Sequence, residues 1–298
     1  MARIVGTENR KTTQLIAAAV DILDAESPMT IRQLFYRLVS RGLIPNDRKH
    51  YQLTSRVMTK SRDDGRCSFD AIVDRSRPSY SPNVFDDADE YANTVQRSYR
   101  KDYWATQPNH VEIWVEKDAI IGSIEPTTDE LGVTIRVGRG FLSTTKAHEI
   151  ATRFASVDKP ITVFYLGDHD PSGHDIERDL YARIRSYGSG DFNMQRLAIH
   201  KADIAQFNLP PLRIKDSDAR AVKFRAQHGE DCVELDALPP DELRRRIKEA
   251  VELLQDRTLW DRAVMVEKVE LASIKDAASM WALPPADSRD FNAVKGGV

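Results

Sequence analysis

The strongest constraint on the fold is a regular alternation of apolar runs and amphipathic segments between residues 111 and 187. Short apolar runs predict strands at 111–117, 133–138 and 161–167. Segments with helical spacing follow these strands, at 118–131, 144–156 and 173–187. Strands that alternate with helices pair in a parallel sheet covered by helices. We therefore predict an α/β domain over residues 108–282, which includes a helical extension at its C-terminal end.

Carboxylates lie at the ends of two of these predicted strands. Glu116 ends the first strand, and Asp168 and Asp170 follow the third strand in the loop "GDHDPSG". Ligands of parallel sheets bind at the carboxyl ends of the strands. Three close carboxylates repel one another unless a cation offsets their charge. Mg²⁺ prefers oxygen ligands, so we expect Glu116, Asp168 and Asp170 to hold Mg²⁺, with Mn²⁺ as a substitute.

Other residues of this loop bear on the predicted metal site. Gly173 would let the backbone approach closely, and Pro171 would stiffen the turn. His169 and His174 would suit a transition metal, which is the minor alternative. In an extended loop His169 points away from both aspartates, and His174 is expected to cap the following helix or to contact DNA. The Asp-x-Asp pattern alone is weak, because enzymes of sugar transfer also use it.

The N-terminal region is predicted to be helical and is basic. Helices are predicted at 11–24, 31–43 and 51–62, followed by a strand in "CSFDAIVD" at 67–74. Between Arg32 and Arg77 there are 11 Lys or Arg against 5 Asp or Glu, whereas from Val111 onward there are 26 against 32. Helices followed by a basic hairpin region predict a winged-helix DNA-binding domain within residues 1–107. The alternative is an ordinary solvated surface of arginines.

The second predicted helix has one side chain that does not fit its apolar face. Thr30 is its expected N-cap, and its apolar stripe consists of Ile31, Leu34, Phe35 and Leu38. At about 100° per residue, Tyr36 lies about 155° from the centre of the stripe. Arg32 lies one turn earlier on the same side. We predict an exposed phenol with a guanidinium beside it that could hold a phosphate; the alternative is a surface tyrosine without a role.

These motifs together resemble a known family. "VEKDAI" (residues 115–120) with "GDHDPSG" (residues 167–173) resembles the toprim domain shared by topoisomerases, primases and some nucleases. With "IRQLFY" (residues 31–36) ahead of it, the arrangement resembles the A subunit of topoisomerase VI and its meiotic double-strand-break relative, in the minimal form found in phages, plasmids and bacterial mobile elements. The resemblance implies that Tyr36 attacks DNA, that Arg32 and Glu116 assist, and that the chain acts as a Mg²⁺-dependent homodimer on double-stranded DNA.

Two further segments carry the resemblance less closely. "GRGFLSTTK" (residues 138–146) loosely resembles the family's glycine-lysine-glycine-tyrosine segment but departs from it at Leu142, Ser143 and Lys146. "VELDAL" (residues 233–238) resembles a late family motif, and Glu234 would either support the metal ligands or be a surface carboxylate. His174 is a second candidate for such support. The expected DNA-binding residues are Arg37, Arg56, Lys60, Arg62, Lys117, Arg139 and Lys146.

The resulting hypothesis is Mg²⁺-dependent DNA cleavage by tyrosine transesterification, giving a 5′-phosphotyrosyl link. It covers both double-strand-break formation and topoisomerase-like cleavage and religation. One alternative is a toprim nuclease that uses water, and another is a DNA-binding regulatory or defence-complex subunit with a weak or silent site. The sequence has no clear glycine-rich ATP-binding motif, so ATP-driven strand passage would need a separate B-type ATPase subunit.

Composition limits the class of protein. The chain has 41% hydrophobic and 30% charged residues with a mean hydropathy of −0.48, and no apolar run approaches the length of a membrane span. Residues 1–11 lack the apolar core of a signal peptide. The two cysteines, Cys67 and Cys232, lie far apart. We expect a soluble protein of a reducing bacterial cytoplasm, with phage or plasmid origin included.

The predicted organisation has three parts. A polar linker at 74–91 and a short helix at 89–103 lead to a domain boundary near residue 107. The α/β domain then runs over 108–282, and the tail at 283–298 is expected to be disordered.

Overall fold

The computed structural model describes residues 10–73, 82–138, 140–214 and 218–279. The chain divides into two compact units, Met1–Pro78 with Pro108–Gln255 and Ser79–Gln107 with Asp256–Val298. A border between the units lies at residue 107, where we expected a domain boundary. The N-terminal helices, however, belong to the same unit as the sheet. Residues 256–279, which we assigned to the α/β domain, belong to the other unit.

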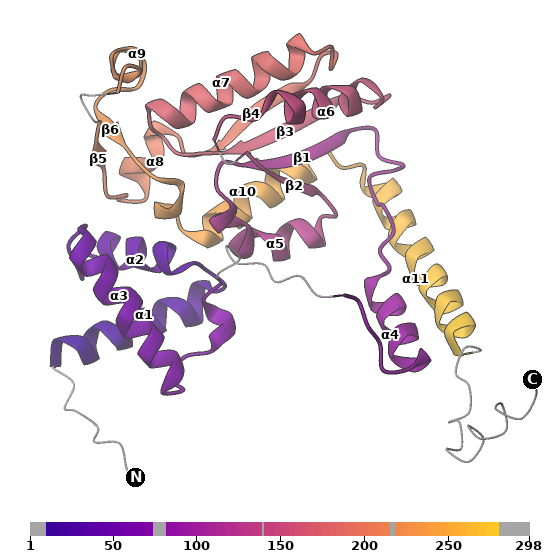
Figure 1. Cartoon of the computed structure of the whole chain (residues 1–298), viewed down its shortest axis with the longest axis horizontal. Coiled ribbons are helices and arrows are strands. Elements are labelled where there is room, and N and C mark those ends of the chain that lie inside the picture. Colours follow the sequence, from indigo (N-terminus) through magenta and orange to yellow (C-terminus); the bar gives the residue numbers. More distant parts are fainter. Residues whose placement is uncertain (1–9, 74–81, 139, 215–217, 280–298) are drawn as a thin grey trace, which may run out of the picture. The chain divides into compact units, whose positions relative to one another are not determined.

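The centre of the first unit is a parallel sheet with the strand order β2-β1-β3-β4 (Figure 1). Its strands are β1 (His110–Val115), β2 (Thr134–Val137), β3 (Ile161–Leu166) and β4 (Asn193–Ala198). All three strand pairs are parallel, and Val115 at the end of β1 pairs with Leu166 at the end of β3. The predicted α/β class is therefore confirmed, and the carboxyl ends of β1 and β3 meet at one edge.

Helices cover both faces of this sheet. The helices are η2 (Asp118–Ile120), α5 (Ile121–Glu130), α6 (Thr144–Ala155), α7 (Pro171–Ser186) and α10 (Pro240–Glu252). Figure 1 shows α6 and α7 on one face and α5 and α10 on the other. Trp114, Phe154 and Tyr165 belong to the buried core beneath α6 and α7. Each fully buried side chain of this size contributes about 2 kcal/mol or more, so the core holds the sheet edge rigidly.

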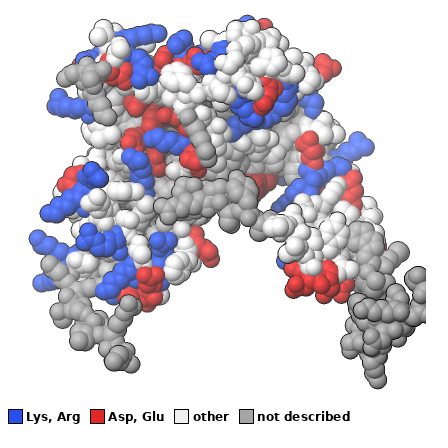
Figure 2. Space-filling model, in the orientation of Figure 1, with Lys and Arg blue, Asp and Glu red and all other residues white. Residues whose placement is uncertain are grey.

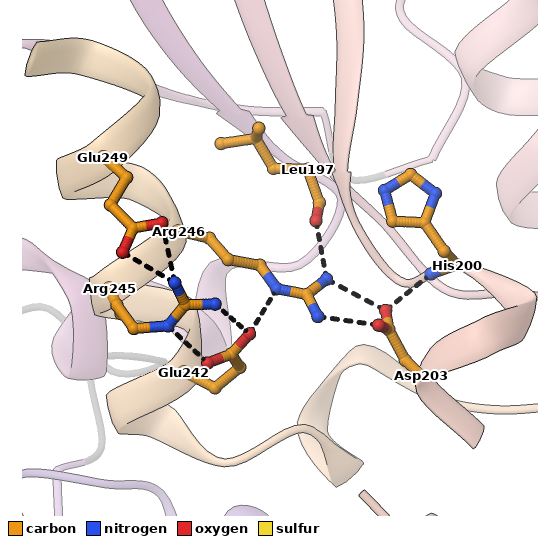
Figure 3. A network of polar contacts seen from close by, with 7 residues as sticks. All are labelled: Leu197, His200, Asp203, Glu242, Arg245, Arg246 and Glu249. Carbon is orange, nitrogen blue, oxygen red and sulfur yellow. Dashed lines mark hydrogen bonds and ion pairs between the residues drawn. The ribbon is translucent and has the colours of Figure 1, made fainter. Parts of the chain in front are cut away.

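Arg246 fixes α10 to the sheet, as Figure 3 shows. Its guanidinium donates to the Leu197 carbonyl at the end of β4 (2.9 Å) and to both carboxylate oxygens of Asp203 (2.6 and 2.9 Å). Asp203 lies in α8 (Lys201–Gln206) and also accepts from the His200 backbone N–H (2.8 Å). Arg246 and Asp203 are both largely buried. One side chain therefore ties α10 to β4 and α8.

Replacing Arg246 by methionine is expected to lower the free energy of unfolding by about 3 kcal/mol, because Asp203 would remain as an unpaired buried charge. Arg245 is the matched control, since it is about half exposed and pairs with Glu242 and Glu249 on its own helix. Arg245→Met should cost less than about 1 kcal/mol. Urea unfolding of both variants measures the difference, and equal losses would contradict the assignment.

The N-terminal part of the same unit contains the three predicted helices, α1 (Arg10–Glu26), α2 (Ile31–Ser40) and α3 (Arg48–Asp63). Thr30 caps α2 as expected: its side chain accepts from the Gln33 backbone N–H, and the Gln33 side chain accepts from the Thr30 N–H. Leu34 and Leu38 pack with residues of α1 and α3 in a buried core. The helical prediction for this region is confirmed.

The strand predicted at 67–74 is wrong for the described residues up to 73. The segment forms a short 3₁₀ turn, η1 (Phe69–Ala71), and one isolated bridge between Met29 and Ile72. The Ser68 side chain accepts from the Asp70 backbone N–H, which favours a turn over a strand. No hairpin is present within 10–73, so a winged helix is not confirmed; the end of the segment lies outside the described residues.

The first unit also contains a small two-stranded sheet and its flanking helices. These elements are β5 (Leu212–Arg213), α9 (Ala221–His228), β6 (Asp231–Cys232) and η3 (Leu235–Ala237). They follow β4 and α8 along the chain.

The second unit pairs α4 (Ala88–Ser98) with α11 (Arg257–Ser279). Tyr99 and Lys101 bond to Glu270, and Tyr103 packs edge-on against Trp260. The predicted short helix is confirmed as α4, whereas the predicted tail and residues 74–81 of the linker lie outside the described residues. Within the described ranges, none of the helices combines the length and the apolar character that a bilayer crossing requires.

Candidate functional site

The candidate site begins where β1 and β3 end. Glu116 extends β1, since its backbone N–H donates to the Leu166 carbonyl of β3 (3.0 Å). Its carboxylate Oε2 accepts from the backbone N–H of Asp168 (3.0 Å). Both side chains are almost fully buried, at 8% and 5% exposure. The structure therefore brings Glu116 and Asp168 into direct contact across 52 residues of sequence.

Asp170 completes this group as the N-cap of α7. Its Oδ1 accepts from the Gly173 backbone N–H (2.6 Å), and Pro171 opens the helix. A Cβ on residue 173 would lie 2.4 Å from the Asp168 carbonyl oxygen and 3.1 Å from Glu116 Oε2. Gly173 is thus required for the close packing of the helix start against the other two carboxylates.

A late segment of the chain adds two more carboxylates. His169 and Val233 exchange two backbone hydrogen bonds (2.8 and 3.0 Å), and the Leu235 N–H donates to Asp168 Oδ1 (2.8 Å). These hydrogen bonds position Glu234 and Asp236 beside the other carboxylates. Asp236 is 1% exposed, and neither of its carboxylate oxygens has a hydrogen-bond partner within the part of the chain that the structure describes.

Two basic side chains lie among the carboxylates of the site. Lys117 Nζ lies 2.6 Å from Asp168 Oδ2 and 3.9 Å from Glu234 Oε2. Arg32 Nη2 lies 2.8 Å from the same Glu234 oxygen. Arg32, Glu234, Lys117 and Asp168 therefore form a continuous line of charged contacts between α2 and the end of β3.

Three carboxylates of the site, those of Glu116, Asp170 and Asp236, hold protons more tightly than ordinary ones. Burial, together with the nearby charge of Asp168, raises the pKa of Glu116 to about 7. Burial raises the pKa of Asp170, and it raises the pKa of Asp236 to about 6 despite the attraction of Lys117 and Arg32. The site therefore has more negative charge than its basic residues offset. Glu116, Asp168 and Asp170 are the residues here that could hold a cation.

Asp236→Asn is expected to stabilise the protein above neutral pH. Because folding raises this pKa from 3.8 to about 6, the folded state binds more protons, and stability is lost as the pH rises through this range. Removing the ionisable group should raise the free energy of unfolding by about 3 kcal/mol at pH ~8 and by little at pH ~4. Urea unfolding at both pH values checks this. An Asp236→Asn protein no more stable than wild type at the higher pH would contradict it.

The predicted exposure of Tyr36 is wrong. Tyr36 is only 5% exposed, although it does lie opposite the apolar stripe of α2. The reason is that η3 packs on this second face of α2, so both faces are covered. Burial raises the pKa of the phenol to about 12; Glu234 adds to this effect and Arg32 opposes it. Arg32 itself is exposed, as predicted.

Tyr36 lines a cavity of about 320 Å³ that is open to solvent. The cavity is lined by Arg32, Phe35, Tyr36, Asn46, Asp47, Arg48 and Tyr51. These residues belong to α2, to α3 and to the loop that joins them. Arg32 and Arg48 therefore line the same cavity as Tyr36, whereas Glu116, Asp168 and Asp170 do not.

The expected DNA-binding residues have different environments. Arg37 is turned inward and bonds twice to Glu26 (2.7 and 2.8 Å), Arg62 lies over the Phe69 ring, and Lys146 pairs with Glu149. Arg56 and Lys60 are exposed on α3, and Figure 2 shows Lys and Arg side chains over the α1–α3 part of this face. Lys117 contacts carboxylates, as described above, and Arg139 lies outside the described residues.

Three histidines gather beside the carboxylates. His169 Nδ1 lies 3.0 Å from His174 Nε2, and His228 at the end of α9 completes the group. His174 does not cap α7, because Asp170 does so. Sequence reasoning missed His228, for which no local signal exists. It also missed Asp236, although the spacing "ELD" after the recognised Glu234 could have indicated it.

Comparisons with known proteins assign the chain to no family. No protein-family model matches it, and a search of the curated proteins found no significant match.

Proposed function

We propose that the chain is a Mg²⁺-dependent DNA-cleaving transesterase, in which Tyr36 attacks a phosphodiester and the sheet-edge carboxylates hold the metal. The observation that carries this proposal is the meeting of Glu116, Asp168 and Asp170 at one edge of the sheet. The resemblance of the motifs to the topoisomerase VI A family supports it, with α1–α3 as the winged-helix part and the parallel sheet as the toprim part.

The residues of the sheet edge fit a hard divalent cation. Glu116, Asp168 and Asp170 offer only oxygen atoms, and the raised pKa values of Glu116 and Asp170 indicate negative charge that a cation would offset. Gly173 keeps space at these oxygens that a Cβ would fill. When bound, Mg²⁺ would stabilise the negative charge of the phosphorane and of the departing 3′ oxygen.

In the proposed reaction, a phosphate ester bond to Tyr36 replaces the phosphate ester bond to the 3′ oxygen of the DNA. The Tyr36 oxygen forms a bond to phosphorus and the bond to the 3′ oxygen breaks, while the phenol loses its proton and the 3′ oxygen gains one. Arg32 lies beside the phenol and opposes the rise of its pKa. A guanidinium also binds a phosphate in a bidentate manner, so Arg32 would both hold the DNA backbone and favour the phenolate.

The open side of Tyr36 favours a site shared between two chains. The phenol opens on a cavity flanked by Arg32 and Arg48, which lacks the metal carboxylates of its own chain. A DNA phosphate that entered there would meet the carboxylates of a second copy. This arrangement is a homodimer that cuts both strands, and religation or strand passage would then depend on a separate ATPase subunit.

Mixing two inactive variants is expected to restore cleavage. In a heterodimer of Tyr36→Phe and Glu116→Gln chains, one shared site would have an intact tyrosine and an intact glutamate. Such a site cuts one strand, so nicked plasmid with protein bound should appear in the mixture but with neither variant alone. If each site lies within one chain, the mixture stays inactive, and the shared-site proposal is contradicted.

The experiment that tests the proposed function uses the purified wild-type chain, supercoiled plasmid and Mg²⁺, followed by denaturation with detergent. We expect linear DNA that carries covalently attached protein at its 5′ ends. EDTA added before the reaction should prevent it. Absence of any cleavage across Mg²⁺ and Mn²⁺ concentrations would contradict the proposal.

A water-dependent nuclease is the second candidate, and one observation favours it. Tyr36 is only 5% exposed and its pKa is raised to about 12, so the free chain holds its phenol protonated and covered. A hydrolytic reaction would need the same three carboxylates without the tyrosine. Linear DNA without attached protein in the same assay would identify it.

A further inference from the structure

The cluster of His169, His174 and His228 has the geometry of a metal site different from the carboxylate site. One ring nitrogen of each residue lies within 4.8 Å of the others, and His169 Nδ1 and His174 Nε2 are 3.0 Å apart. Two nitrogens bound to one Zn²⁺ at about 2.0 Å in tetrahedral geometry are about 3.3 Å apart. The cluster therefore needs little movement to surround an ion.

The hydrogen bonding of the cluster is incomplete within the described residues. His169 is 1% exposed, and its Nε2 has no hydrogen-bond partner among the residues that the structure describes. Burying a nitrogen of this kind without a partner is costly. If a metal ion binds one ring nitrogen of His169, the protein has to provide a hydrogen-bond partner only for the other ring nitrogen.

The surroundings hold the three rings and leave one side open. The Phe224 ring packs 5.3 Å from His169, 5.5 Å from His174 and 4.9 Å from His228. His174 and His228 also line a cavity of about 400 Å³. Three protein ligands with one open position are typical of a reactive zinc site and differ from a closed structural site.

Positive charge near the cluster is largely paired. Arg196 lies 2.7 Å from Glu177, Arg178 lies 2.7 Å from Asp175, and Arg220 lies 2.9 Å from Asp218. Arg178, Arg220 and Lys223 line the cavity. Because three neutral imidazoles leave the full charge of a bound cation in place, an anionic fourth ligand such as a phosphate oxygen would offset that charge.

We propose that His169, His174 and His228 bind one transition-metal ion, Zn²⁺ or a similar ion, with a fourth position open to this cavity. Imidazole nitrogens select Zn²⁺, Co²⁺ or Ni²⁺, whereas the oxygen ligands of Glu116, Asp168 and Asp170 suit Mg²⁺. The chain would then carry two cation sites of different chemistry on either side of one loop. The histidine site does not depend on the proposed cleavage of DNA.

The test is Co²⁺ binding to the metal-stripped full-length chain, followed by visible absorption and then by displacement with Zn²⁺. One Co²⁺ per chain is expected to give ligand-field bands, which Zn²⁺ removes and excess Mg²⁺ does not. His174→Gln and His228→Gln should each weaken binding at least about tenfold. The matched controls are His148→Gln, an exposed histidine of α6, and Glu116→Gln, and both should leave the bands unchanged.

Thermal unfolding without metal verifies that the histidine variants fold, and these two side chains are only half-buried. Unchanged Co²⁺ affinity in both folded histidine variants would overturn the proposal. Loss of the bands in Glu116→Gln alone would place the ion among the carboxylates and would overturn it as well. Absence of any Co²⁺ or Zn²⁺ binding to the wild-type chain would have the same consequence.

Discussion

Glu116→Gln is expected to lower the rate of Mg²⁺-dependent DNA cleavage at least about a hundredfold, because it removes one charged ligand from the site. The fold should persist. A glutamine oxygen can still accept from the Asp168 N–H, and the raised pKa of Glu116, about 7, indicates that an uncharged side chain is tolerated here. Initial rates of plasmid linearisation over a range of Mg²⁺ concentrations measure the effect.

The control for this variant is Asp158→Asn. Asp158 is an exposed carboxylate between α6 and β3, at the opposite end of the strand that leads to Asp168. Its substitution removes the same charge and should leave the rate unchanged. A Glu116→Gln protein that cleaves at the wild-type rate would show that the carboxylates are not the catalytic centre. If neither variant cleaves DNA but both bind it, the result would favour a regulatory subunit with a silent site.

Tyr36→Phe should remove covalent protein–DNA adducts, with a fall of at least about a thousandfold, because the phenyl ring has no oxygen to attack phosphorus. The ring itself should stay in place, since it packs 5.3 Å from the Phe35 ring and is buried between α2 and η3. Denaturing gels of labelled DNA quantify the adduct, and filter binding before denaturation shows whether DNA affinity is retained.

Tyr51→Phe is the matched control for Tyr36. Tyr51 lines the same cavity and packs edge-on against Phe35, so its phenol shares the environment without the proposed role. Adducts at the wild-type level in Tyr36→Phe would exclude Tyr36 as the nucleophile. Cleavage without adduct in that variant, at the wild-type rate, would instead favour water as the attacking group.

Much of the fold followed from local patterns. The alternation after residue 110 predicted three of the four strands of the parallel sheet and the helices between them, because β1 and β3 are mostly apolar and buried. β4 was missed since its sequence "NMQRLA" is half polar, and it is buried only at its end. The strand predicted at 67–74 failed because local side-chain bonds at Ser68 formed a turn.

The site could be predicted only where it depends on strand ends. Glu116 and Asp168 meet because parallel neighbouring strands end at the same edge. The environment of Tyr36 depends on Glu234 and η3, about 200 residues further along the chain, and no helical wheel contains that information. Asp236 and His228 also lie far from the ends of β1 and β3 in the sequence. The pairing of Val233 with His169 brings their segment to the site.

The most direct test of the central claim is to identify the residue that carries the DNA. The wild-type adduct formed with Mg²⁺ would be digested with nuclease and trypsin, and the peptides analysed by mass spectrometry. Trypsin cuts after Arg32 and Arg37, so Tyr36 lies in the short peptide of residues 33–37. We predict a 5′-phosphonucleotide on this peptide, on Tyr36. A nucleotide on any other residue, or cleaved DNA with no modified peptide, would contradict the account.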